Sequence, residues 1–279
     1  MVLFPNGKLN LGLQILRKRP DGYHDLRTVF FPVPVCDALE LVHAPPPAFA
    51  EAPESPVQLY MTGIPIQGNP EDNLCVKAYQ LLKKDFPQLP PVAIHLHKKI
   101  PAGAGLGGGS ADGAFLLRLL NDKFRLGIDQ EALISYALQL GSDCPFFILN
   151  TPCLAEGRGE HLQPIDLDLS GYQFLLVNPG VHVNTGWAFS QLSPAEPPVS
   201  MIDIIRLPVE RWRGQLLNDF EEPVCRQHPA LRQIPEKLYA AGAVYAAMTG
   251  SGSTFFGIFR KGVLPQLEWP EGYSVFASS

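Results

Sequence analysis

A glycine-rich stretch, "PAGAGLGGGSADGA" at residues 101–114, constrains this chain more than any other feature. It holds six glycines and one proline in fourteen positions. Glycine at this density allows backbone conformations with positive φ and lets the main chain approach a ligand closely. The apolar alternation of residues 92–100 predicts a strand directly before it, and an amphipathic helix is expected directly after it. Amides of the loop and of the helix start would then converge on one anion, for which a triphosphate is the natural candidate.

The helix that follows has its own start signals. Ser110 is predicted as its N-cap, and Asp112 suits the positive first turn of a helix. Its apolar face is predicted to comprise Phe115, Leu116, Leu119 and Leu120.

The glycines also allow two other interpretations besides a phosphate-binding loop. The spacing Gly103-x-Gly105-x-x-Gly108 satisfies the dinucleotide fingerprint, but that fold needs a second strand about 30 residues later. The sequence after the first helix, "IDQEALISYALQLG", predicts another helix instead. A Walker A loop lacks its Gly-Lys-Ser/Thr ending here. A flexible loop before a helix stays open as the plain alternative.

Composition narrows the classes of partner. The chain has 279 residues, of which 46% are hydrophobic and 18% charged, with a net charge of −5 and no basic block. This length suits one bilobal domain or two closely packed domains. The acidic balance disfavours nucleic acid and anionic membranes as partners. The five cysteines form no CxxC, so neither a zinc knuckle nor a disulfide framework is indicated.

No targeting segment is indicated, and the longest weakly polar run, at 239–248, is too short to span a bilayer. We therefore expect a reduced, cytoplasmic protein. His95 and His97 would share one face of a strand, but with no further ligand nearby they are interpreted as ordinary strand residues.

Strand patterns cluster first along the chain and helical patterns follow, which favours an α+β fold. The proline-rich stretch 44–56 is expected to be an exposed loop. A hairpin is expected around "TGSGST" within 243–259. Asn73 is a predicted helix cap, and a further helix is expected to end at Gly141. Other strands are predicted at 8–16, 26–33, 37–43, 57–63 and 172–180, and a last helix at 229–242 with a stop at Gly242.

Several motifs together resemble the GHMP kinases, the superfamily of galactokinase, homoserine kinase and mevalonate kinase. "PAGAGLGGGS" matches the superfamily loop Pro-x-x-x-Gly-Leu-Gly-Ser/Gly-Ser, and "MTGSGSTFFGIF" resembles its second glycine-rich turn. The resemblance implies a two-lobed α+β fold with the active site between the lobes. Residues 1–155 would form the ATP-binding lobe, which would be similar to domain 2 of ribosomal protein S5. Residues 156–279 would form a ferredoxin-like lobe.

Four further motifs are similar to a GHMP kinase of the non-mevalonate isoprenoid pathway: "KLNLGL", "RPDGYHDLRTVF", "GSDCPFF" and "NPGVHVNT". This resemblance implies phosphorylation of the 2-hydroxyl of 4-diphosphocytidyl-2-C-methyl-D-erythritol by ATP, with Mg²⁺ expected alongside. By position, Asp143 would be the catalytic base and Lys8 its basic partner. The ATP contacts implied are Asn73, Leu74, Lys98, and Pro101, Ala102, Gly103, Ala104, Gly105, Leu106, Gly107, Gly108, Gly109, Ser110 and Ala111.

Substrate contacts are implied at Asn10, Tyr23, His24, Thr185 and Phe189, with the cytosine between the rings of Tyr23 and Phe189. The chemistry is consistent with these roles, because an alcohol nucleophile needs a carboxylate near its proton and phosphoryl transfer needs positive charge. A monomer or a homodimer would serve equally.

Plainer interpretations stay beside these. Without the resemblance, Lys8 would be a solvated strand lysine, Asp143 a helix N-cap and Phe189 an ordinary core aromatic. Another GHMP small-molecule kinase, of the mevalonate or homoserine type, is the alternative enzyme. A non-catalytic nucleotide-binding relative is the alternative from another class. Ala111 departs from the motif, because a second hydroxyl or amide residue is common there.

Overall fold

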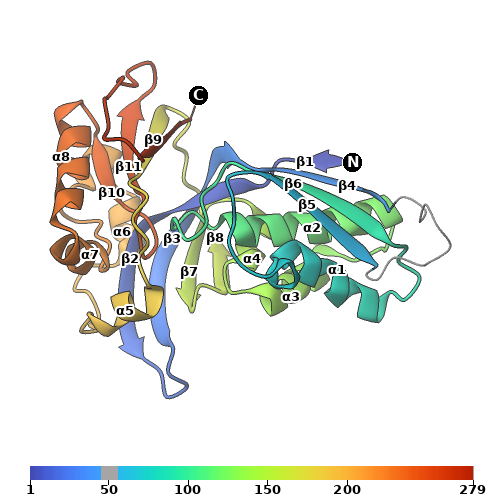
Figure 1. The fold of residues 1–279 in the computed structure, drawn as a ribbon. Helices are drawn as coiled ribbons and strands as arrows, with labels where there is room; N and C mark the ends of the chain where they lie inside the picture. Colours follow the sequence, from blue (N-terminus) through green and yellow to red (C-terminus); the bar gives the residue numbers. More distant parts are fainter. Residues whose placement is uncertain (45–55, 279) are drawn as a thin grey trace. The chain divides into compact units, whose positions relative to one another are not determined.

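A computed structural model describes residues 1–44 and 56–278, and the expected proline-rich loop at 44–56 lies almost entirely outside them (Figure 1). The chain forms two compact units, each assembled from separate segments. Unit one comprises residues 1–7, 36–102 and 107–150. Unit two comprises residues 8–35, 103–106 and 151–279. The glycine-rich stretch therefore contributes to both units.

Unit one holds a mixed four-stranded sheet in the order β1-β4-β6-β5 (Figure 1). Strand β6 lies antiparallel to β4 and parallel to β5, with Ile94 opposite both Leu41 and Leu59. The three predicted strands of this unit are confirmed as β4 Ala38–His43, β5 Val57–Gly63 and β6 Val92–Lys98. A short strand that was not predicted, β1 Val2–Leu3, pairs with β4. On β6, the ring of His95 stacks on Tyr60, and His97 lies 2.9 Å from the hydroxyl of Thr62.

Unit one also contains helices. The predicted N-cap is correct for α1 and wrong for α2. Asn73 caps α1 as predicted, because its Oδ1 accepts the Cys75 amide at 2.9 Å. The prediction for Ser110 is wrong: α2 begins at Gly108, and the N-cap is Gly107 with φ +69°. Glycine adopts this left-handed conformation easily because it has no Cβ. Because it also has no side chain, α2 begins without a capping side-chain hydrogen bond. The bounds are η1 Pro70–Asp72, α1 Leu74–Asp85, α2 Gly108–Phe124, α3 Gln130–Leu140 and α4 Cys144–Leu149.

The predicted apolar face of α2 is confirmed, since Phe115, Leu116, Leu119 and Leu120 are all buried. Helix α3 ends at Gly141 as expected. The close packing of α1 on α2 depends on Gly113, where an added Cβ would lie 2.9 Å from the Cβ of Leu74.

Unit two holds two four-stranded sheets, ordered β2-β3-β7-β8 and β10-β11-β9-β12. The hairpin predicted around "TGSGST" is confirmed, with Met248 opposite Phe255. The strands are β2 Asn6–Lys18, β3 His24–Cys36, β7 Cys153–Gly157, β8 His161–Pro164, β9 Tyr172–Asn178, β10 Tyr245–Met248, β11 Phe255–Arg260 and β12 Ser274–Ala277. The first two residues of β2 and the last of β3 belong to unit one.

The single helix predicted at 229–242 is two elements, η3 Pro229–Arg232 and α8 Gln233–Ala240. Pro235 lies in the first turn of α8 and has no N–H to donate to the carbonyl of Leu231, so the α-helical hydrogen bonds are interrupted between η3 and α8. The predicted stop at Gly242 is confirmed, with φ +95°. The other helices are α5 Thr185–Ser190, α6 Met201–Ile205, η2 Val209–Arg211 and α7 Glu221–Gln227.

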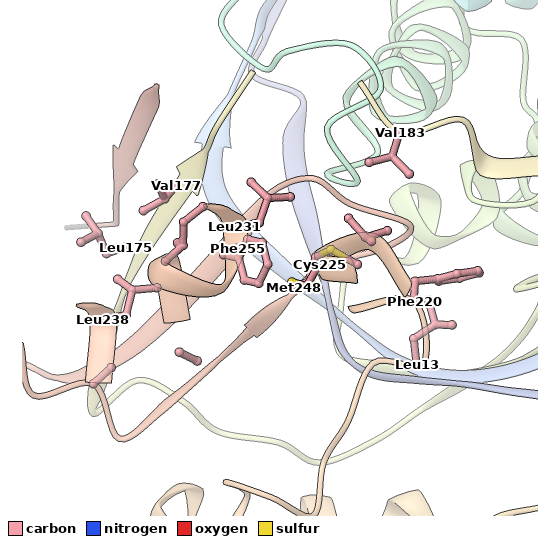
Figure 2. Packing of buried hydrophobic residues seen from close by; sticks show 14 of the residues in the cluster. Leu13, Leu175, Val177, Val183, Phe220, Cys225, Leu231, Leu238, Met248 and Phe255 are labelled. Carbon is pink, nitrogen blue, oxygen red and sulfur yellow. The ribbon is translucent and has the colours of Figure 1, made fainter. Parts of the chain in front are cut away.

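A buried apolar cluster in unit two joins β2 to the second sheet and to α7 and α8 (Figure 2). Leu13 and Ile15 enter it from β2, Phe255 from β11 and Leu238 from α8. The mixture of separate sheets and helices confirms the predicted α+β class. Among residues 1–44 and 56–278, no helix combines the length and apolar character needed to cross a lipid bilayer.

Phe255 is fully buried in this cluster, whereas Phe4 in unit one is 64% exposed. We expect Phe255→Ala to lower the free energy of unfolding by about 3–5 kcal/mol, because the cavity adds to the lost burial. Phe4→Ala should change it by about 0.5 kcal/mol or less. Urea denaturation of both variants measures the difference, and equal losses would contradict the packing described.

Candidate functional site

Strand β2 presents a polar row on the face opposite its leucines. Lys8 and Asn10 are 5% and 2% exposed although both are polar. The Lys8 ammonium donates to Asn10 Oδ1 at 2.6 Å and lies 4.7 Å from the centroid of the Phe30 ring. Asn10 Nδ2 in turn donates to Thr28 Oγ1 at 3.0 Å. The positive charge is therefore buried and held in one place, which is not the behaviour of a solvated strand lysine.

The middle of the glycine-rich stretch packs beside this row within unit two. The Lys8 amide donates to the carbonyl of Leu106 at 2.9 Å, and the Asn10 amide donates to Thr249 Oγ1 at 2.9 Å. Gly105 has φ +77°, and an added Cβ there would lie 2.3 Å from the Thr249 carbonyl oxygen. We call Lys8, Asn10, residues 103–106 and Thr249 the β2 cluster. It brings the basic residue and the two glycine motifs together.

Sequence reasoning missed two members of this arrangement. Thr249 stands inside the second glycine motif, and that position was the available signal. Asn218 was not signalled at all: its Nδ2 donates to the carbonyls of Met248 and Gly250 at 2.8 and 2.9 Å, which holds the glycine turn.

Asp143 belongs to unit one and occupies the N-cap position of α4, with φ −84° and ψ −18°. Within the described chain its carboxylate makes no capping hydrogen bond to that helix, so capping does not account for it. The next residue, Cys144, is buried, and its burial raises the pKa of the thiol to about 12 although a hydrogen bond with Ser110 lowers it. Ser110, at the start of α2, thus lies against the residue that follows Asp143.

Lys98 was predicted to contact adenosine, and its side chain is buried in unit one. The residue is 2% exposed, and its ammonium bonds to Asp37 Oδ2 and, at 2.6 Å, to Asp112 Oδ2. Asp37 Oδ1 accepts the amides of Lys99 and Ile100 at 2.6 and 2.8 Å. We call Lys98, Asp37 and Asp112 the buried triad. Contact of Lys98 with adenosine stays a prediction, and its ammonium is already engaged inside unit one.

The charges of the buried triad have a clear electrostatic consequence. Burial raises the pKa of Asp112 to about 7, although the Lys98 ammonium opposes this and the carboxylate of Asp37 adds to it. Burial alone would lower the pKa of Lys98, and the two carboxylates outweigh it, so that this pKa is raised. Sequence analysis placed Asp112 at a positive helix end and did not foresee this pairing. The alternation Val92, Ile94, Leu96, Lys98 was a usable signal, because it sends Lys98 to the inner face of β6.

Two further predicted ATP contacts in unit one, Asn73 and Leu74, have structural roles. Asn73 caps α1, and its Nδ2 lies 3.7 Å from the Met61 sulfur. Leu74 packs against Gly113 of α2. Their contact with adenosine stays a prediction.

Two of the predicted substrate residues meet in unit two. The rings of His24 and Phe189 stack with centroids 4.7 Å apart and planes 15° from parallel. Phe189 also meets Phe220 edge-on at 4.9 Å. Burial, and then the charge of Lys18, lowers the pKa of His24, which favours the neutral imidazole. The third residue, Tyr23, is 57% exposed, and the guanidinium of Arg158 lies 5.1 Å from its ring centroid.

Thr185 is the first residue of α5, the helix that carries Phe189. Its hydroxyl lies 3.1 Å from that of Ser251 in the second glycine motif. The aromatic pair and the glycine turn are thereby linked through one side-chain contact. Chemically, unit two offers a flat aromatic surface with a neutral imidazole, suited to an uncharged heterocycle, and a buried ammonium suited to transferred negative charge.

Comparison with known proteins agrees with this chemistry. The GHMP kinases N terminal domain matches residues 73–151, and the GHMP kinases C terminal domain matches residues 208–267. A Bacteroides fragilis protein named 4-diphosphocytidyl-2-C-methyl-D-erythritol kinase is 53% identical over 259 residues, which are 93% of this chain and 92% of its own. A Bacteroides thetaiotaomicron protein of the same name is 51% identical over 277 residues, covering 99% of this chain and 98% of its own.

Among solved structures, a crystal structure of 4-(cytidine 5′-diphospho)-2C-methyl-D-erythritol kinase matches with a TM-score of 0.76 and 32% identity. The match covers 92% of this chain and 90% of that one. The fold expected from the resemblance, that of a GHMP kinase, is confirmed.

The raised pKa of Asp112 predicts how stability changes with pH. The folded protein holds this proton up to about pH 7, whereas the unfolded chain releases it near the ordinary value of 3.8. Raising the pH between these values therefore favours unfolding, by at most about 1.4 kcal/mol per pH unit. Asp112→Asn has no such proton, and the neighbouring Cys75 thiol, whose pKa burial raises well above its usual value, stays neutral in this range.

Urea denaturation of both proteins at pH 5, 6, 7 and 8 measures this difference. We expect the unfolding free energy of the wild type to fall relative to that of Asp112→Asn as the pH rises. Parallel curves would contradict the assignment.

Proposed function

As the chain belongs to the GHMP kinases, we propose that it transfers the γ-phosphoryl group of ATP to the 2-hydroxyl of 4-diphosphocytidyl-2-C-methyl-D-erythritol. ATP enters as its magnesium complex, and ADP leaves. The proposed substrate rests on one observation. About half of all residues are identical to those of proteins named 4-diphosphocytidyl-2-C-methyl-D-erythritol kinase, over more than nine-tenths of each chain. The protein then makes an isoprenoid precursor in the cytoplasm from small molecules alone.

Asp143 takes the proton of the attacking hydroxyl in this proposal. A carboxylate accepts that proton as the new P–O bond forms, and the bond from the γ-phosphorus to the bridging oxygen breaks toward ADP. Lys8 supplies the positive charge that phosphoryl transfer requires. Its burial supports this role, because a charge already held by Asn10 needs little reorganisation when the substrate binds. Residues 101–111 bind the phosphates through backbone amides.

His24 and Phe189 bind the cytosine in this proposal. A stacked aromatic pair that carries a neutral imidazole can hold a flat uncharged base and bond to its polar edge. Tyr23 supplies a second aromatic face, and Asn10 and Thr185 supply polar contacts. A mevalonate or homoserine kinase would have no use for such a pair. The aromatic arrangement therefore favours the cytidyl substrate over these alternatives.

Asp143→Asn tests the base. The amide has nearly the same shape but cannot accept the proton, so turnover should fall by about 100-fold or more while nucleotide binding persists. The matched control is Asp129→Asn, since Asp129 also stands at a helix start, where it accepts the Ala132 amide at 2.8 Å. Steady-state rates with purified protein, magnesium, ATP and the cytidyl alcohol decide the matter. A folded Asp143→Asn enzyme with the wild-type rate would refute the role.

Phe189→Ala tests cytosine recognition. Losing the stacking face should weaken binding of the cytidyl substrate by about 1–3 kcal/mol, raising its KM, while the KM for ATP changes little. Phe124→Ala is a matched control, because Phe124 is also half-buried and pairs with a histidine, His43, at 5.5 Å. Michaelis constants for each substrate separate the two effects. Equal changes for both substrates would mean that Phe189 serves only packing.

A further inference from the structure

We propose that the buried triad is a positioning device for ATP: Lys98, Asp37 and Asp112 clamp together the two ends of the glycine-rich loop and thereby set its shape for the triphosphate. The inference rests on the proposed function for the identity of the nucleotide. In this proposal the three residues act on the triphosphate through the backbone of the loop. The separate prediction that Lys98 contacts adenosine is not used here.

Asp37 holds the backbone at the start of the glycine-rich loop. One oxygen of this carboxylate, Oδ1, accepts the amides of both Lys99 and Ile100, the two residues directly before Pro101. Its other oxygen bonds to the Lys98 ammonium. The side chain of Asp37 is fully buried, so water does not compete for these bonds. Two successive amides fixed on one charged oxygen leave the entry to the loop little freedom.

Asp112 ties the end of the loop, where α2 begins, to the same lysine. This residue lies in α2, four positions after Gly108, where the helix begins. Its Oδ2 bonds to the same ammonium at 2.6 Å, so Lys98 joins the helix to Asp37 and through it to the loop entry. The two ends also touch: a Cβ added at Gly108 would lie 2.8 Å from Ile100 Cγ2 and 3.5 Å from Asp37 Oδ2. Entry, exit and triad are packed as one piece within unit one.

Stability alone is a weak reason for burying these charges. Removing an ammonium and two carboxylates from water has a large desolvation cost, and apolar residues of similar volume often stabilise a core as well or better. Charged hydrogen bonds, unlike apolar contacts, impose a definite geometry. A loop that must direct several amides at one triphosphate requires such geometry, since small displacements of binding groups are costly.

Asp112→Ala tests the clamp, because it removes the bond from α2 to Lys98 and leaves Lys98 and Asp37 as a one-to-one pair. We expect the dissociation constant for a non-hydrolysable ATP analogue to rise by at least about tenfold. Binding of cytidine 5′-diphosphate, the probe for the other substrate, should stay within about twofold. Titration calorimetry with magnesium measures both constants, and neither depends on turnover.

Two variants serve as controls. Asp112→Asn keeps an oxygen that can accept from Lys98, so it should retain most of the nucleotide affinity that Asp112→Ala loses. Leu133→Ala removes a buried side chain from α3, 8% exposed, and should lower stability with no selective effect on nucleotide binding. If Asp112→Ala does not fold, Asp37→Asn replaces it. Asp37 uses both of its oxygens, Oδ1 for the Lys99 and Ile100 amides and Oδ2 for Lys98, so an asparagine there, with one acceptor oxygen, must lose part of this set. Asp112 bonds to Lys98 through one oxygen, Oδ2, which an asparagine can replace.

Hydrogen exchange at the amides of Lys99 and Ile100 gives a second readout. We expect these amides to exchange faster in the variant that loses nucleotide affinity and not in Leu133→Ala. A folded Asp112→Ala or Asp37→Asn protein with wild-type nucleotide affinity would overturn the clamp, as would equal losses for both ligands. Absence of kinase activity in the wild type, with these binding results intact, would refute the proposed substrate and leave the clamp standing.

Discussion

The hydrogen bonds of β2 tie the two glycine motifs of unit two to its buried lysine. The Lys8 amide donates to the carbonyl of Leu106, and the Asn10 amide donates to Thr249 Oγ1. The Lys8 ammonium donates to Asn10 Oδ1, two residues along the same strand and therefore on the same face. Beyond Gly12, whose φ is +70°, Leu13 and Ile15 enter the apolar cluster of unit two. One strand thus carries both the polar cluster and part of the core, so a shift of its register would disturb both.

In unit one, buried charged side chains restrain the glycine-rich loop. The glycine-rich stretch has few side chains with which to hold itself, and glycine lowers the energetic barrier to other conformations. Asp37 and Asp112 stand outside the loop and pair with one buried lysine, Lys98. A loop with few side chains, as the proposed binding of phosphate by backbone amides requires, is thus restrained at its ends by residues outside it.

Much of the fold could be predicted from the sequence because the signals were local. Alternation marked β2 and β6, Asn73 marked the start of α1, and Gly141 and Gly242 marked helix ends. The start of α2 could not be predicted from capping preference, because Gly107 in a left-handed conformation replaced a capping side chain. The last helix is divided because Pro235 has no amide hydrogen to donate to the carbonyl of Leu231. The motifs identified the superfamily, which the comparisons confirm, and the division into domains at residue 155 stays a prediction.

The sequence alone determined the family, the α+β class and the places of the elements with strong local patterns, such as β5, β6 and α3, since each pattern lies in residues close together in the chain. Only the tertiary structure decided which side chains meet. Lys98 and Asp37 are 61 residues apart, and Asn10 and Thr249 are 239 apart. No local pattern encodes such pairs, because they form when separate strands and loops pack and buried polar groups must find partners within reach. The surroundings of Lys98 are of this kind, because a buried ammonium requires carboxylates and the fold supplies two.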